Sequence, residues 1–131
     1  MTRFATLTAL LLAGLPVAAA AQDYGEAEFM TSCAVCHGES GLGDGPMASV
    51  LDIDVPGLTG LAARNGGVFP VMETLGVIDG RSAVMAHGGP MPVWGDRYAA
   101  SATALGGPVD AEMIARGRLL SLVYYLEAIQ D

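Results

Sequence analysis

Two cysteines and a histidine stand together in the segment Cys33-Ala34-Val35-Cys36-His37, and the chain of 131 residues has no other cysteine. Two thiols three positions apart lie on one turn of a helix, so they can act on the same group. The adjacent imidazole can bind a metal ion. The pattern therefore points to thiol redox chemistry, metal binding or covalent attachment of a haem.

The C-x-x-C-H spacing favours haem attachment. Cys33 and Cys36 can form thioethers to two vinyl groups on one edge of a haem, and His37 then gives the iron an imidazole ligand. Three alternatives remain open: a thioredoxin-like redox pair, a zinc site that adds His87, and a copper site of thiolates and methionine. A thioredoxin-like pair would need a preceding strand, and the sequence before Cys33 has no strand pattern.

Met91 is the candidate for a second iron ligand. It lies between two prolines in the segment Gly89-Pro90-Met91-Pro92-Val93-Trp94-Gly95, which has no helical stripe on which a methionine could pack. A thioether is a soft ligand that raises the reduction potential of a haem. His87 is the competing ligand, and Met72 and Met85 are expected to fill the core.

Residues 1–21 have the pattern of a secretory signal peptide. Arg3 is their only charge, a long apolar stretch follows, and Pro16 precedes a run of small residues. We expect cleavage after Ala21, with Ala20 as the alternative position. An uncleaved anchor is the competing interpretation, because the apolar stretch is nearly long enough to cross a bilayer.

Residues 22–131 then form one exported, periplasmic domain with no stable membrane insertion after cleavage. Loss of Arg3 changes the formal net charge from −8 to −9, and the chain has no lysine. Such an acidic domain is not expected to bind nucleic acid. A redox partner with a basic or neutral docking patch would complement its charge.

Short helices joined by glycine-rich loops must position the ligand candidates. The first is expected to begin at a capping box formed by Asp23 and Glu26, and the last at Asp110. No segment alternates with period two, so the predicted fold class is all-α. Short helices bury little in a domain of about 110 residues unless a large apolar group fills the centre. The expected helices cover approximately residues 23–36, 47–51, 58–64, 70–78, 96–105 and 110–129.

These features resemble a class I c-type cytochrome over nearly all of residues 22–131. The resemblance rests on the CAVCHG and MPVWG segments and on the 54 positions from His37 to Met91. Gly25 and Phe29 stand where the family has a small residue and an aromatic one. The family's fold would make the N- and C-terminal helices cross at Gly25, with Phe29, Leu122 and Tyr125 in contact, around one covalent haem c.

The resemblance also implies roles for residues around the haem. The Val55-Pro56-Gly57-Leu58 segment looks like the loop whose proline carbonyl accepts the second N–H of the axial imidazole, so Pro56 would orient His37. Pro46, in the Gly-Asp-Gly-Pro segment, is the alternative. Three further residues are candidates to bind the haem propionates: Arg64, Trp94 and Tyr98.

The function implied is one-electron transfer, without enzymatic activity. No paired catalytic carboxylates, nucleophile–base motif or phosphate-binding loop is visible in the sequence. The alternative is a haem enzyme or enzyme subunit, of a peroxidase-like or sulfur- or nitrogen-oxidoreducing type, with a labile sixth ligand. The chain lacks the lysine ring of the mitochondrial type and carries an additional segment, Asp96–Pro108, without an assigned role.

Overall fold

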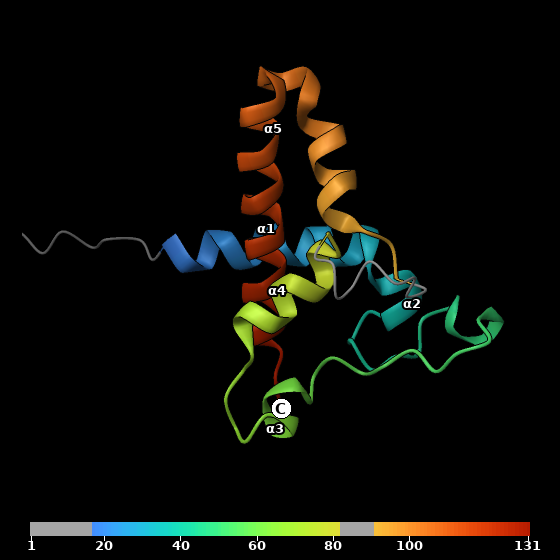
Figure 1. The fold of residues 1–131 in the computed structure, drawn as a ribbon. Helices are drawn as coiled ribbons and strands as arrows, with labels where there is room; N and C mark the ends of the chain where they lie inside the picture. Colours follow the sequence, from blue (N-terminus) through green and yellow to red (C-terminus); the bar gives the residue numbers. More distant parts are fainter. Residues whose placement is uncertain (1–16, 82–90) are drawn as a thin grey trace, which may run out of the picture.

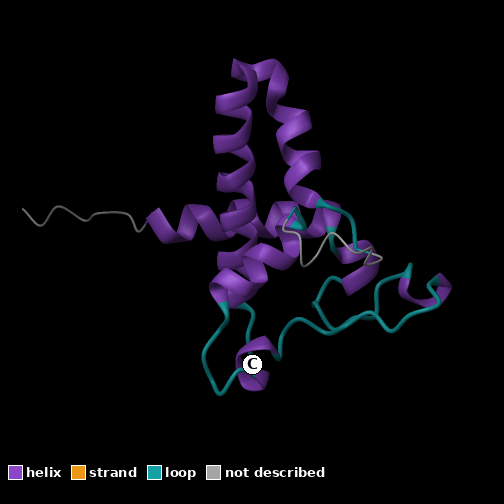
Figure 2. Ribbon diagram, in the orientation of Figure 1, coloured by secondary structure: helices purple, strands orange, loops and turns teal. Residues whose placement is uncertain are grey.

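The computed structural model of the chain describes residues 17–81 and 91–131. Every regular element in these residues is helical, which confirms the all-α prediction. The elements are α1 (Val17–Ser32), α2 (Ala34–His37), the 3-10 helix η1 (Ala48–Val50), α3 (Leu61–Arg64), α4 (Val71–Asp79) and α5 (Trp94–Ala128). None of the described helices combines the length and hydropathy of a membrane span. Figure 2 shows the hairpin of α5 at one end of the molecule and the loops at the other.

The first helix begins earlier than predicted. Asp23 lies inside α1, which starts at Val17, so the capping-box interpretation is wrong. The alanines at 18–21 are strong helix formers and extend the helix toward the N-terminus. In the full chain α1 therefore runs across the predicted cleavage point at Ala21.

The short elements between the end helices lie close to their predicted positions. The helix predicted at 58–64 is shorter, because α3 begins only at Leu61. Glycines in the left-handed region end two of the helices: Gly66 (φ 68°) follows α3, and Gly80 (φ 69°) caps α4. Pro70 occupies the N-cap of α4 rather than its first turn.

The long α5 is a hairpin of two helices. Gly107 has non-helical backbone angles (φ 86°, ψ −175°), and Pro108 opens the second half. The halves, 94–106 and 108–128, run antiparallel (Figure 1). The sequence predicted this division, but Trp94 and Gly95 belong to the helix and not to the preceding loop. Gly95 is buried against the side chains of Asp79 and Arg81, which fixes the first turn.

The crossing of α1 and α5 occurs where the sequence predicted it. A Cβ on Gly25 would lie 2.7 Å from the Cβ of Tyr125 and closer still to the Ser121 carbonyl oxygen. One turn further along α1, the rings of Phe29 and Tyr125 have centroids 5.2 Å apart. Phe29 and Leu122 are fully buried at this crossing. The missing side chain of Gly25 thus permits the close approach of the two backbones.

The core extends from this crossing to α4 and to the first half of α5. Ile78, Tyr98, Leu119 and Val123 are buried with the residues of the crossing in one cluster. The prediction that Met72 fills the core is wrong, because its side chain is 73% exposed on α4. Met85 lies outside the described residues.

Gly25→Ala is expected to destabilise the folded protein by about 1–3 kcal/mol, because the added methyl group overpacks the crossing against α5 backbone. The measurement is denaturant unfolding of the haem-loaded protein. Gly117→Ala in α5 is the matched control, because a Cβ there meets no atom within 4 Å. The control should be neutral or stabilising by up to about 1 kcal/mol. Equal effects of the two variants would contradict a close crossing at Gly25.

Candidate functional site

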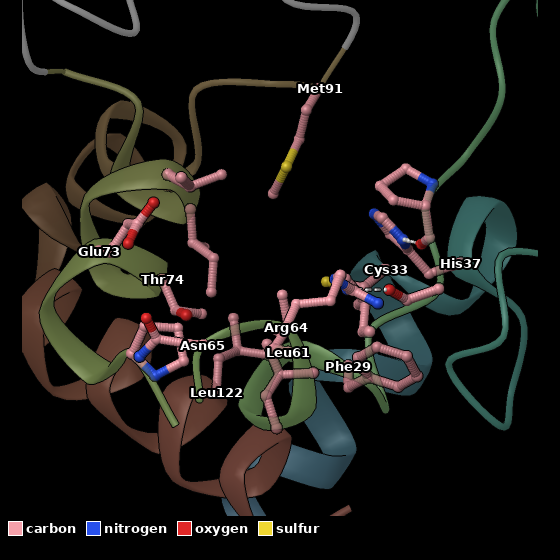
Figure 3. A pocket seen from close by; sticks show the side chains of 17 residues that line it. Phe29, Cys33, His37, Leu61, Arg64, Asn65, Glu73, Thr74, Met91 and Leu122 are labelled. Atoms are coloured by element: carbon pink, nitrogen blue, oxygen red, sulfur yellow. Dashed lines mark hydrogen bonds between the residues drawn. The ribbon is translucent and has the colours of Figure 1, made fainter. Parts of the chain in front are cut away.

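Two adjoining cavities lie between α1, α4, α5 and the loops. The first has a volume of about 360 Å³ and the second about 500 Å³. Residues from four separate segments line both cavities, so the two form one crevice: Cys33, His37, Pro56, Val77 and Met91. Figure 3 shows the first cavity, with apolar side chains such as Phe29 and Leu122 among its walls.

The cysteines and the histidine lie on one turn at the junction of α1 and α2. The backbone N–H groups of Cys36 and His37 donate to the Cys33 carbonyl over 3.0 and 2.9 Å. Cys33 lines both cavities, and Cys36 lines the second. Burial raises the pKa of the Cys33 thiol to about 12, with further contributions from Glu28 and Cys36. A thioredoxin-like pair needs a lowered thiol pKa, so this environment disfavours that alternative.

The zinc alternative gains no support from the described residues. Among residues 17–81 and 91–131 there is no group of three or more His, Cys, Asp or Glu side chains placed to hold a metal ion. His87, which the zinc alternative requires, lies outside those ranges.

His37 is held by the loop that follows η1. Its Nδ1 lies 3.0 Å from the carbonyl oxygen of Pro56, the contact implied by the family resemblance. With Nδ1 donating to this carbonyl, Nε2 is the ring nitrogen left to bind a metal. The Pro46 carbonyl, the alternative acceptor, instead lies 3.4 Å from the Ser49 hydroxyl.

Met91 enters the crevice from a different wall. It lies in the short segment before α5, and its sulfur points into the first cavity (Figure 3). Met91 and His37 therefore line the same cavities although 54 positions separate them in the sequence. His87, the competing ligand, cannot be compared because it lies outside the described residues.

The three candidates for propionate binding lie in different places. Arg64 lines the first cavity, and its guanidinium donates to the Gly57 carbonyl over 2.8 Å. Trp94 lines the second cavity, where the guanidinium carbon of Arg97 lies 5.2 Å from its ring centroid. Tyr98 is not among the lining residues of either cavity and is only 2% exposed.

The role of Tyr98 toward a propionate stays a prediction, because its buried hydroxyl has no hydrogen-bond partner among the described residues. Its ring packs in the core, with the Arg118 guanidinium carbon 3.9 Å from the ring centroid. Burial raises the pKa of the phenol, and the carboxylate of Glu28 contributes to the shift. The helical register of α5 explains this position, because Trp94 and Tyr98 share one face and Tyr98 lies one turn further from the crevice.

Sequence reasoning missed three polar residues of the first cavity. Asn65, Glu73 and Thr74 line it together with Arg64. Thr74 is buried, and it lies one helical turn before the buried Ile78 of α4. The spacing of four residues places Thr74 and Ile78 on the same face of α4, and this sequence pattern could have indicated that Thr74 is buried.

The crevice fits a haem by the chemistry of its donors. Two thiols on one turn can bond to one edge of the ring, and an imidazole and a thioether can reach the iron. The remaining walls are largely apolar, as a porphyrin requires. Arg64 and Asn65 supply polar groups on the wall formed by α3, where the ring's carboxylates can be bound.

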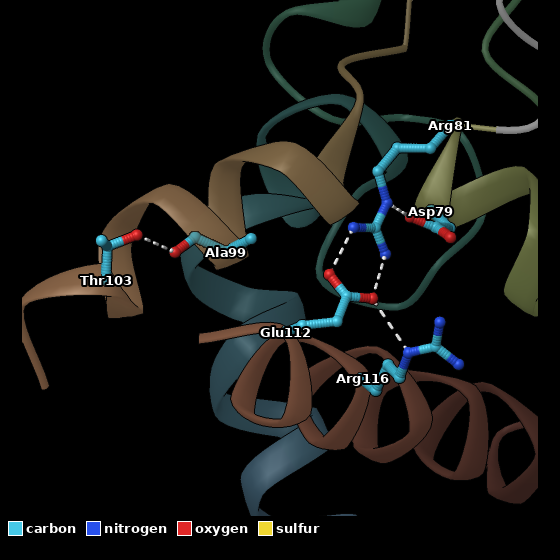
Figure 4. A network of polar contacts seen from close by, with 6 residues as sticks. All are labelled: Asp79, Arg81, Ala99, Thr103, Glu112 and Arg116. Atoms are coloured by element: carbon cyan, nitrogen blue, oxygen red, sulfur yellow. Dashed lines mark hydrogen bonds and ion pairs between the residues drawn. The ribbon is translucent and has the colours of Figure 1, made fainter. Parts of the chain in front are cut away.

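A network of ion pairs joins α4 to α5 beside the segment that carries Met91 (Figure 4). Arg81 pairs with Asp79, and its two terminal nitrogens bind the Glu112 carboxylate over 2.7 and 3.1 Å. Arg116 adds a contact of 2.9 Å to the same carboxylate. These partners lower the pKa of Glu112 to about 2, with the hydrogen bond from Arg81 as the largest cause.

One comparison with known proteins identifies a family. A sequence model described as Cytochrome c matches residues 22–103. The match includes the thiol pair, His37 and Met91, and it ends within the first half of α5. No curated protein and no solved structure matched the chain.

Glu112→Gln is expected to reduce thermal stability at neutral pH and to have no effect near pH 2. The folded pKa of Glu112 lies below its ordinary value of 4.5, so its ion pairs stabilise the protein above pH 4.5. This contribution is lost as the pH falls toward 2. The measurement is the difference in Tm between wild type and variant across that range, with the exposed Glu39→Gln as control. A difference independent of pH would contradict the assignment.

Proposed function

Because the chain belongs to the cytochrome c family, we propose that it is a periplasmic one-electron carrier whose haem iron is bound by His37 and Met91. The observation that supports this ligand pair is that both side chains line the same two cavities. The family binds haem c covalently, and the two thiols beside His37 supply the attachment points. The bound haem supplies an iron that alternates between the ferrous and ferric states.

The chain's own residues set the environment of that iron. Pro56 accepts the Nδ1–H of His37, which fixes the ring and makes the imidazole a stronger electron donor. Apolar side chains such as Phe29, Leu122 and Leu126 line the first cavity and exclude water. A dry site with two fixed ligands changes little between oxidation states, which favours rapid electron transfer.

Met91 determines whether the protein is a carrier or an enzyme with an open site. Met91→Ala is expected to lower the reduction potential, because a thioether favours ferrous iron. The potential of the variant should also change more when an external ligand is added. The wild type should be low-spin in both states and bind carbon monoxide poorly, whereas the variant should bind it readily. The measurements are absorption spectra and potentiometric titration, with retention of haem on a denaturing gel as proof of covalent attachment.

Met72→Ala is the matched control for that experiment, because Met72 is exposed on α4. It should leave the spectrum and potential unchanged. A wild-type protein with a high-spin ferric spectrum would contradict Met91 as ligand and favour the haem-enzyme alternative. An unchanged low-spin spectrum in Met91→Ala would also contradict Met91 and would favour His87 as the sixth ligand.

We further propose that the redox partner docks beside Cys36. Val35 and Ile53 line the second cavity and are about half exposed, and the exposed Val50 lies three residues before Ile53. Asp52 and Asp54 flank Ile53 and are exposed. An apolar centre with an acidic margin suits a partner that presents apolar residues within a basic or neutral patch.

The exposed carboxylates of Asp52 and Asp54 predict that the rate of electron transfer to charged inorganic oxidants depends on ionic strength. Reduction of a cationic cobalt(III) complex should become slower as ionic strength rises, while reduction of ferricyanide should become faster. Asp52→Asn with Asp54→Asn should slow the cationic reaction at low salt by roughly two- to fivefold. Asp23→Asn with Glu26→Gln on α1 removes the same charge elsewhere and is the control. Equal effects of the two pairs would contradict docking beside Cys36.

A further inference from the structure

The last residues of the chain hold the loop that contacts His37. The side-chain amide of Gln130 donates to the Leu58 carbonyl over 2.9 Å and to the Leu126 carbonyl over 2.6 Å. Its oxygen accepts the backbone N–H of Ala62 over 2.9 Å. Gln130 therefore connects the end of α5 to both sides of the segment 58–62.

This segment follows directly on Pro56, whose carbonyl accepts from His37. Gly57 separates Pro56 from Leu58, and glycine leaves the backbone free to rotate. The Pro56–Gly57 peptide packs against Gly43, where a Cβ would lie 3.2 Å from both the Pro56 carbonyl carbon and the Gly57 nitrogen. The direction of the Pro56 carbonyl therefore depends on this packing and on what holds the peptide groups that follow.

Four contacts hold the peptide groups of residues 57–59, and that of Gln130 with the Leu58 carbonyl is one of them. The N–H of Leu58 donates to the Gly41 carbonyl over 2.6 Å, Arg64 donates to the Gly57 carbonyl over 2.8 Å, and the backbone N–H of Asp131 donates to the Thr59 carbonyl over 3.0 Å. Arg64 is exposed, so water competes for its bond. The contacts of Gln130 are partly buried, which makes them stronger than an exposed bond of the same geometry.

We propose that Gln130 is a positioning residue for the axial histidine, acting through Leu58 and Pro56. This inference rests on the proposed function, because it concerns the iron ligand His37. A firmly held Pro56 carbonyl keeps a strong hydrogen bond to Nδ1–H, and the imidazole then donates more strongly to iron. Stronger donation favours ferric iron, so loss of Gln130 should raise the reduction potential.

Gln130→Leu tests the proposal, because it preserves much of the volume and removes the three hydrogen bonds. We expect the equilibrium constant for reduction to rise two- to tenfold, and tenfold corresponds to about 59 mV for one electron. The Nδ1 proton of His37 should exchange faster with solvent in the NMR spectrum of the ferrous protein. Gln130→Glu is a second variant of nearly the same shape that removes the two donated bonds, and it should also speed the exchange of the Nδ1 proton. Its added charge lowers the potential independently, so the potential is compared in Gln130→Leu alone.

Asp131→Ala is the matched control. Asp131 accepts the Thr59 hydroxyl over 2.9 Å, so it tethers the same two segments without bonding to the Leu58 carbonyl. It should lower the Tm while leaving the potential and the proton exchange unchanged. If the Gln130 variants also lower only the Tm, Gln130 is merely structural and the proposal is wrong. If the wild type itself lacks a low-spin spectrum, the proposed ligand pair is wrong instead.

Discussion

The close crossing of α1 and α5 at Gly25 is the contact on which the rest of the structure depends. It places Phe29 and Leu122 in the wall of the first cavity, and Cys33 follows one turn after Phe29. The backbone N–H of Cys33 donates to the Phe29 carbonyl over 2.8 Å, so the thiol turn continues the packed part of α1. The same contact that builds the core therefore sets the position of the thiol turn.

The first half of α5 gives a role to the segment that the sequence left unassigned. It places Tyr98 beneath Arg118, which also binds Glu28 of α1 through two hydrogen bonds of 2.7 and 2.9 Å. One guanidinium thus joins both halves of α5 to α1. The first half of α5 lines the second cavity only through its first turn, at Trp94 and Arg97, whereas the second half lines the first cavity through Leu122 and Leu126.

The sequence was informative about those features of the fold that a local pattern of residues determines. The thiol spacing, the small residue at 25 and the glycine break at 107 are each visible within a few residues. The exposure of Met72 and the burial of Tyr98 depend on how the helices rotate against one another, which local periodicity does not determine. The bonds of Gln130 to Leu58 and Ala62 join positions 72 and 68 residues apart, so no local pattern could reveal them.

The arginines explain why the surface is more acidic than the net charge suggests. Each of the five arginines in the described residues has an intramolecular partner: Arg64 a carbonyl, Arg97 an indole ring, and Arg81, Arg116 and Arg118 carboxylates. The chain has no lysine, so all the basic side chains of the described residues, apart from histidine, make contacts within the fold. Arg64 and Arg97 keep their charge at the crevice, since their partners are uncharged, and the exposed Asp52 and Asp54 oppose it beside the second cavity. The ion pairs that stabilise the helices thus take up carboxylates of α1, α4 and α5, and Asp52 and Asp54 are left outside them.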